Sequence, residues 1–278
     1  MTDFLNPLDP SEEEQTPHPV ALTIAGSDSG GGAGIQADLK TFAACEVHGT
    51  SVLTLITAQN TRGVSGIQML PRPTIRAQYE AVVSDLKPAA AKTGALGSEE
   101  VIATVAEMLE DHPIDQLVVD PVMISKHGDP LLAEPAQKML RDRMLEGALL
   151  VTPNRHEAEA LCGRTVNNVG SMKEAAKRIH DFGPDNVLIK GSHFDKIVRD
   201  IFYDGSGFIE YGADRVKSER LHGSGCVYSS AITAKLAVGQ ELAEAIGFAR
   251  TFISGAIDHA PLVGEGISPV NPMFDHWK

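Results

Sequence analysis

The sequence has few cysteines, little positive charge and no long apolar run, and each shortage narrows the class of protein. Its three cysteines, Cys45, Cys162 and Cys226, are odd in number and far apart, with no C-x-x-C pair. They indicate neither a disulfide framework nor a zinc site, which fits a reducing compartment. The net charge is −13, which argues against nucleic acid as a partner.

Segments for membrane insertion or secretion are also missing from the sequence. No apolar run approaches the roughly 20 residues that a membrane-spanning helix needs, so we expect no membrane partner. The first residues, Met1-Thr2-Asp3-Phe4, lack the basic start and apolar core of a secretory signal. We therefore expect a cytoplasmic protein.

Two common nucleotide-binding motifs do not fit the glycine-rich segment 26–34. G-x-G-x-x-G fails because positions 28 and 35 are Asp and Ile, and G-x-x-x-x-G-K-[ST] fails because Gly32 stands where Lys is needed. The segment follows a strand-like run, Val20 to Ala25, and precedes a helix-like one. Its glycines allow the backbone to approach a small ligand closely, although a plain turn is the simpler interpretation.

Strand-like and helix-like segments alternate along most of the chain. Residues 1–19 are polar and contain proline, so we expect a disordered tail followed by one domain over 20–278. Strands are expected at 20–25, 51–57, 89–93, 116–119, 148–152 and 187–190. Helices are expected at 35–47, 74–86, 98–111, 134–145, 154–162, 171–182, 226–238 and 241–260, with a hairpin formed by 197–203 and 208–211. This order predicts an α/β fold with a mostly parallel central sheet and helices on both faces.

A second glycine-rich turn, Leu221-His222-Gly223-Ser224-Gly225-Cys226, runs into a helix-like segment. Amides at a helix N-terminus form an anion site, and the positive helix end lowers the pKa of a thiol. An anion cradle that holds a base suggests transfer of a charged group such as phosphoryl. A capped helix with a buried cysteine explains the same pattern.

Polar residues gather at the expected carboxyl ends of the strands, where open α/β sheets bind their ligands. Asn154 and Glu157 have the spacing of a helix N-cap and its N3 partner, so structure alone explains them. Each of the others also has a structural interpretation, and only their shared placement favours a site. These residues are Asp28, Asp38, Gln59, Asn60, Lys92, Asp120, Asn154, Glu157, Lys190 and His193.

The combined motifs resemble those of the hydroxymethylpyrimidine/phosphomethylpyrimidine kinases of thiamine biosynthesis, which have the ribokinase-like fold. The similarity runs from about residue 20 to about residue 275. The matching stretches are 21–42, Thr57-Ala-Gln-Asn-Thr-Arg-Gly-Val64, Val119-Asp-Pro-Val-Met123, Gly128-Asp-Pro-Leu-Leu132, Thr152-Pro-Asn154 with Glu157-Ala-Glu159, Lys190-Gly191 with His193, and His222-Gly-Ser-Gly-Cys226.

The resemblance implies a two-step kinase. ATP phosphorylates 4-amino-5-hydroxymethyl-2-methylpyrimidine and then its monophosphate, with Mg²⁺ as the cofactor and a homodimer or higher homo-oligomer as the assembly. Catalysis is assigned to Cys226 and to the anion hole of Gly223, Ser224 and Gly225. The pyrimidine is assigned to Gly26, Asp38, Gln59 and Val122, the ATP phosphates to Asn154 and Lys190, and Mg²⁺ to Asp120 and Glu157.

The sequence departs from the family pattern at Ala95, where Met is common in the pyrimidine pocket. Smaller departures are Ser192, Leu221, Ser224 and Val227. Three other functions stay open: a pyridoxal kinase of the same fold, a cysteine hydrolase that uses His222 and Cys226, and a pyrimidine-binding protein without turnover. For the hydrolase, no Asn or Asp is evident from the sequence as the residue that orients His222.

Overall fold

The computed structural model describes residues 18–123, 131–192, 197–214, 216 and 218–276. Its centre is one nine-stranded sheet with the order β3-β2-β1-β4-β5-β6-β7-β8-β9. The pairs from β2 through β7 are parallel, and β3, β8 and β9 are antiparallel to their neighbours. The strands are β1 (Val20–Asp28), β2 (His48–Asn60), β3 (Gly63–Met69), β4 (Ala90–Thr93), β5 (Leu117–Val119), β6 (Leu150–Val151), β7 (Val187–Ser192), β8 (Ile197–Tyr203) and β9 (Phe208–Asp214).

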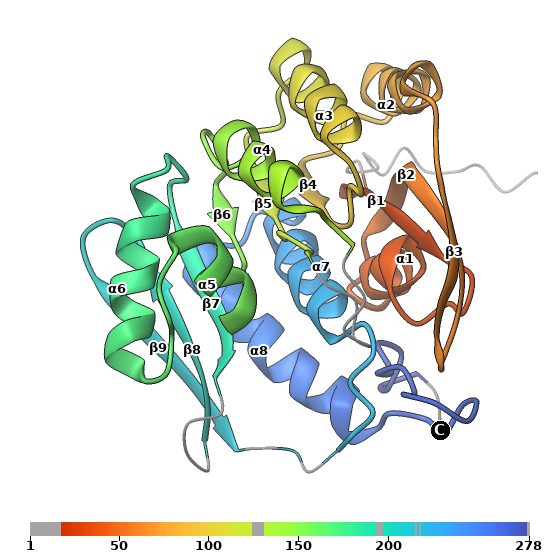
Figure 1. Cartoon of the computed structure of the whole chain (residues 1–278). Helices are drawn as coiled ribbons and strands as arrows, with labels where there is room; N and C mark the ends of the chain where they lie inside the picture. Colours follow the sequence, from red (N-terminus) through yellow and green to blue (C-terminus); the bar gives the residue numbers. More distant parts are fainter. Residues whose placement is uncertain (1–17, 124–130, 193–196, 215, 217, 277–278) are drawn as a thin grey trace, which may run out of the picture.

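Helices cover both faces of the sheet (Figure 1). One face carries α2 (Arg72–Asp85), α3 (Glu99–Asp111), α4 (Glu134–Met144), α5 (Arg155–Cys162) and α6 (Val169–His180). The other face carries α1 (Gly34–Ala44), α7 (Ser224–Ala237) and α8 (Leu242–Asp258). The expected ribokinase-like α/β fold with a mostly parallel sheet is confirmed.

The two faces have separate apolar cores because successive strand residues point to opposite sides. Ala21 of β1 and Val118 of β5 belong to the core under α1, α7 and α8. Their chain neighbours Leu22 and Val119 belong to the core under α2–α6. Strands buried on both faces read as continuous apolar runs, which is why these central strands are visible in the sequence.

The expected strands and helices are present, with shifted ends, and one strand was missed. β3 pairs antiparallel with the end of β2, so Gln59 and Asn60 lie inside a two-stranded ribbon and not in a loop after the strand. Ser27 and Asp28 likewise belong to β1. The sequence hides β3 because most of its residues are exposed. The expected disordered tail lies almost entirely outside the described residues, as does His193.

The C-terminal segment after α8 returns to the tip of the β2–β3 ribbon. The amide of Ile267 donates to the Thr61 carbonyl at 2.7 Å, and Glu265 forms an ion pair with Arg62. Further on, the Val270 amide donates to the carbonyl of His222 at 3.1 Å. This segment therefore links the ribbon to the turn that precedes α7. No helix among the described residues is long and apolar enough to cross a membrane.

Candidate active site

A cavity of about 1010 Å³ lies at the carboxyl ends of the central strands. It joins the two glycine-rich segments, which are nearly 200 residues apart in the sequence, and it extends to the ends of β5, β6 and β7. Of the residues predicted for the site, all except Asp38 line this cavity. They are Gly26, Gln59, Asp120, Val122, Asn154, Glu157, Lys190, Gly223, Ser224, Gly225 and Cys226.

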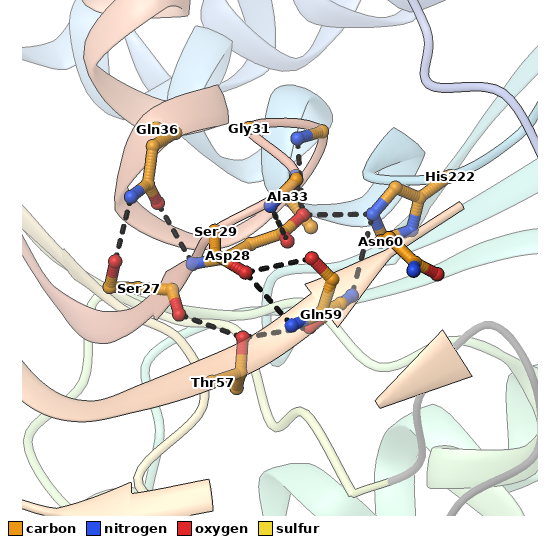
Figure 2. A network of polar contacts seen from close by, with 12 residues as sticks. Ser27, Asp28, Ser29, Gly31, Ala33, Gln36, Thr57, Gln59, Asn60 and His222 are labelled. Atoms are coloured by element: carbon orange, nitrogen blue, oxygen red, sulfur yellow. Dashed lines mark hydrogen bonds and ion pairs between the residues drawn. The ribbon is translucent and has the colours of Figure 1, made fainter. Parts of the chain in front are cut away.

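Asp28 organises the glycine-rich loop between β1 and α1 (Figure 2). Its Oδ1 accepts a hydrogen bond from the Gly30 amide at 2.8 Å, and its Oδ2 accepts from the amides of Gly32 at 3.1 Å and Ala33 at 2.9 Å. The same Oδ2 lies 2.9 Å from Nε2 of His222. Burial by itself raises the pKa of Asp28, but the hydrogen bond from His222 and the loop amides lower it below the ordinary value.

Gln59 lies near the end of β2 with its side chain at the cavity. Its main-chain amide donates to Ser29 Oγ at 2.8 Å, and Ser29 Oγ donates to the Gln59 carbonyl at 2.7 Å. Its side-chain amide lies between Thr57 and His222, as Figure 2 shows. The backbone of Gln59 is thus fixed to the glycine-rich loop while the side chain lines the cavity.

The second glycine-rich turn forms the N-terminus of α7, with Gly223 as the N-cap at φ 76°. A Cβ at Gly223 would come within 1.8 Å of the Gly32 carbonyl oxygen, so the two glycine-rich segments touch at this point. Within the described part of the chain, the amides of Gly225 and Cys226 have no hydrogen-bond acceptor, whereas the Ser224 amide donates to the Leu221 carbonyl at 3.2 Å. Two first-turn amides therefore remain for an anion.

The thiol of Cys226 faces this cavity, but its pKa is raised to about 12, which contradicts the lowering expected from the helix end. Burial is the largest cause. The positive charge of Lys92 opposes it, and the carboxylates of Asp38 and Asp120 add to it. Desolvation of the thiol therefore outweighs the partial positive charge at the helix terminus.

Asp38 is not among the residues that line the cavity, and its assignment to the pyrimidine stays a prediction. Its carboxylate is fully buried and forms an ion pair with Lys92 Nζ at 3.0 Å. It also accepts hydrogen bonds from Thr23 Oγ1 at 2.6 Å and Ser230 Oγ at 2.7 Å. A buried ammonium needs a partner of opposite charge, and Asp38 is that partner.

Lys190 and Asp120 face each other across the ends of β7 and β5. Lys190 Nζ donates to Asp120 Oδ1 at 2.7 Å. The hydroxyls of Thr152 and Ser229 donate to the two oxygens of the same carboxylate, each at 3.1 Å. Both charged groups are nearly buried and line the cavity, so this end of the site already holds a positive charge for a phosphate.

Asn154 and Glu157 form a capping box at the start of α5. This is the structural explanation that their spacing in the sequence suggests. Asn154 Oδ1 accepts from the Glu157 amide at 3.0 Å, and Glu157 Oε2 accepts from the Asn154 amide at 2.8 Å. Burial raises the pKa of Glu157 to about 7, with Lys190 opposing the shift and Asp120 adding to it. Because both residues also line the cavity, the capping role and a role toward a ligand are compatible.

The sequence places Lys92 among the strand-end residues without a role, and it does not reveal the partner of His222. Lys92 is one of the lining residues, and its pKa is raised because Asp38, Cys226 and Asp120 outweigh the effect of burial. His222 was considered only as a partner of Cys226, yet Asp28 orients it. The available signal was a lysine in an otherwise apolar strand, since such a residue requires a buried counterion. The link from Asp28 to His222 spans 194 positions and has no signal in the sequence.

Comparison with known sequences places this site in a defined family. The family model described as phosphomethylpyrimidine kinase matches residues 28–271. A hydroxymethylpyrimidine/phosphomethylpyrimidine kinase from Streptomyces coelicolor is 47% identical over 255 residues, which cover 91% of this chain and 94% of that protein. A thiamine biosynthesis bifunctional protein from Geobacter sulfurreducens is 46% identical over 261 residues, but the chain spans only 53% of its length.

Solved structures agree with the sequence match. Phosphomethylpyrimidine kinase from Clostridium difficile superimposes with a TM-score of 0.78 at 44% identity, covering 86% of this chain and 99% of that one. An ADP complex of Bacillus subtilis pyridoxal kinase gives a TM-score of 0.88 at 35% identity, covering 95% of this chain and 100% of that one. Because the family model spans most of the chain, the chain belongs to the phosphomethylpyrimidine kinase family.

Proposed function

We propose that the protein phosphorylates 4-amino-5-hydroxymethyl-2-methylpyrimidine with ATP, and then converts the monophosphate to the diphosphate, in thiamine biosynthesis. One observation carries the proposal. A single cavity joins the Gln59 side, which suits a pyrimidine edge, to the Lys190 side, which suits a phosphate chain. The names of the relatives described above support the same reaction.

The chemistry divides among residues of this cavity. The substrate hydroxyl oxygen forms a bond to the γ-phosphorus of ATP, the bond from that phosphorus to the bridging oxygen breaks, and ADP leaves. The free amides of Gly225 and Cys226 and the ammonium of Lys190 suit the negative charge spread over the transferred group. As a thiolate, Cys226 is the proposed acceptor of the hydroxyl proton. Because burial raises the pKa of Cys226, the thiol first gives up its own proton to solvent, and the positive charge of Lys92 favours that loss.

Mg²⁺ is proposed to enter with ATP. The described residues include no group of three or more His, Cys, Asp or Glu side chains that could hold a metal ion. Mg²⁺ in kinases is commonly held by one or two carboxylates together with phosphate oxygens, and Asp120 and Glu157 supply two buried carboxyl groups at the cavity. When bound, the ion would neutralise charge on the phosphates.

Pyridoxal phosphorylation is the second candidate, because the pyridoxal kinase fold matches almost the whole chain. Ala95 lines the cavity at a position where the family resemblance implies Met, and the smaller side chain favours a larger ring. A cysteine hydrolase is a weaker candidate: Nε2 of His222 is directed to Asp28 and Gln59, and the raised pKa of Cys226 opposes a resting thiolate. A binding protein without turnover differs only in consuming no ATP.

An assay of ADP release separates these functions. The pyrimidine alcohol, its monophosphate and pyridoxal are compared side by side, with and without Mg²⁺. We expect turnover with both pyrimidines, a lower specificity constant for pyridoxal, and no ADP release without the metal. Preferred turnover of pyridoxal would replace the proposal with the second candidate, and hydrolysis of an activated ester without ATP would favour the hydrolase.

We propose that the enzyme is cytoplasmic and homo-oligomeric. The cysteines Cys45, Cys162 and Cys226 are all unpaired, which suits the reducing cytoplasm. A homodimer or higher homo-oligomer is expected from the family resemblance, and light scattering on the purified chain tests it.

A further inference from the structure

The hydrogen bonds around Asp28 fix the position of one proton on His222. Asp28 Oδ2 accepts from the amides of Gly32 and Ala33 and lies 2.9 Å from His222 Nε2. A carboxylate in this setting is ionised and only accepts hydrogen bonds. His222 Nε2 must therefore carry a proton and donate it to Asp28.

This proton decides how the side-chain amide of Gln59 is oriented. Oε1 of Gln59 lies 3.1 Å from Thr57 Oγ1, and Nε2 of Gln59 lies 3.5 Å from His222 Nε2. An N–H group cannot accept a hydrogen bond from the amide nitrogen. Thr57 has a single hydroxyl proton, and the Ser27 carbonyl accepts it at 3.0 Å. The nitrogen and oxygen of a primary amide have the same shape, so the hydrogen-bond network assigns them.

One arrangement removes both conflicts. With the amide turned over, the Gln59 nitrogen donates to the free lone pair of Thr57 Oγ1, and the Gln59 oxygen faces the Nε2–H of His222. We propose that Asp28 and His222 are positioning residues that hold Gln59 with its oxygen on the His222 side and its nitrogen on the Thr57 side. Figure 2 shows the contacts that link Asp28 to His222, His222 to Gln59, and Gln59 to Thr57.

This polarity selects one way of binding the ring, and here the inference rests on the proposed function. The 4-aminopyrimidine edge has a donor, the amino group, beside an acceptor, the ring nitrogen. Its amino group pairs with the Gln59 oxygen on the His222 side. The hydroxymethyl group is the ring neighbour of the amino group, so it lies on the same side. His222 precedes Gly223 and the first-turn amides of α7, so this orientation directs the reactive hydroxyl toward Cys226.

The 4-oxo analogue of the substrate tests the polarity, because its donor and acceptor are exchanged. The measurement is the ratio of kcat/KM for the 4-amino compound to that for the 4-oxo compound. His222→Phe keeps the ring shape but removes the donor, whereas His222→Gln keeps an N–H near the position of Nε2. Mispairing a buried polar edge costs about a factor of ten or more. We expect the ratio to fall by at least about tenfold in His222→Phe and to stay near the wild-type value in His222→Gln.

A ratio that is unchanged in His222→Phe would overturn the inference, because general damage to the fold lowers both rates together. An independent readout is the ¹⁵N spectrum of the His222 ring in the free protein. We expect the signal of a protonated Nε2, and an unprotonated Nε2 would also overturn the inference. This spectrum needs no turnover. If the wild-type enzyme phosphorylates neither pyrimidine, the proposed function fails while the spectrum still decides the role of His222.

Discussion

Cys226 is the residue on which the proposed chemistry depends most. We expect Cys226→Ala to lose most turnover while pyrimidine affinity changes little, since removal of a general base typically costs about 10²–10⁴-fold. Steady-state kinetics and calorimetry measure the two effects. Cys162→Ala is the matched control, because Cys162 is buried in the core under α2–α6 and does not line the cavity. Near-normal turnover in Cys226→Ala would mean that Cys226 is only a residue of the helix start.

A substitution of Gln59 tests pyrimidine binding separately from ATP binding. Gln59→Leu removes the donor and acceptor from the ring edge but leaves Lys190 and Asn154 in place. An unpaired buried polar group costs about 1–3 kcal/mol, so pyrimidine affinity should fall by about one or two powers of ten while ATP affinity stays unchanged. Gln240→Leu, an exposed change outside the cavity, is the calorimetric control. Equal pyrimidine affinity in the Gln59 variant would remove this residue from the site.

Ala95 provides a prediction for specificity. It lines the cavity and is only half-buried, so a larger side chain has room to project toward the ligand. We expect Ala95→Met to lower the specificity constant for pyridoxal relative to that for the pyrimidine. The shift should be modest, because each methylene in an apolar pocket contributes about 1–3 kcal/mol. If the ratio of the two constants does not move, neighbouring side chains already fill the space.

Single residues differed in how far the sequence could predict them. Cys226, Gln59 and Lys190 lie beside recognisable glycine turns or strand ends, and the fold brings them to one cavity. Asp38 has the same kind of signal but is buried with Lys92, which is 54 positions away. The helix end predicts a lowered pKa for Cys226, and burial reverses the sign of the shift. The burial of Asp38 and of Cys226 depends on long-range partners, which one sequence does not contain.

At the scale of elements, strands and helices with an apolar core face were predictable, and β3 was not. Central strands such as β1 and β5 are apolar because both of their faces are covered. β3 instead carries Gly63, Ser65 and Gly66, with Ile67 45% exposed. It is a strand because it pairs with β2, so tertiary pairing overrides its weak local preference. That ribbon positions Gln59, and its omission hid how Gln59 reaches the cavity.

Asp28 links the loop after β1 to the turn before α7. The contribution of this link to the free energy of unfolding should depend on pH. Its pKa in the folded chain lies below the ordinary value of 3.8. Folding therefore favours the ionised form, so the stabilisation is present above about pH 4. It is lost as the pH falls through the folded-state pKa. We expect Asp28→Asn to cost about 1–3 kcal/mol at pH 7.

Denaturant titrations from pH 7 down to pH 3 test this expectation. The difference in free energy of unfolding between wild type and Asp28→Asn should shrink as the pH falls below 3.8. Asp204→Asn is a useful comparison. Asp204 also has a lowered pKa, but its partners are the local amides of Gly207 and Ser206. A difference for Asp28→Asn that is constant with pH would show that the carboxylate charge does not stabilise the link.

At the scale of the whole molecule, the site depends on contacts between distant parts of the chain. The C-terminal segment holds the tip of the β2–β3 ribbon through Thr61 and the His222 turn through Val270. It therefore supports both neighbours of the cavity, the ribbon that carries Gln59 and the turn that opens α7. A disturbance in this segment should reach the site although the segment lies outside the two glycine-rich turns of the sequence.

Gly266 is the position where this whole-molecule link can be tested with one methyl group. A Cβ at Gly266 would lie 1.9 Å from the carbonyl oxygen of Thr61, so Gly266→Ala must push the segment away from the ribbon. Gly66→Ala, on the same ribbon, is the matched control, because its Cβ would meet only Ala58 Cβ at an ordinary 3.6 Å. Overpacking of this kind costs about 1–3 kcal/mol.

We expect Gly266→Ala to lower the melting temperature and to raise KM for the pyrimidine, with both values near wild type in Gly66→Ala. If Gly266→Ala lowers the melting temperature but leaves KM unchanged, the C-terminal segment contributes only to stability. Displacement of the ribbon would then leave Gln59 and His222 in place.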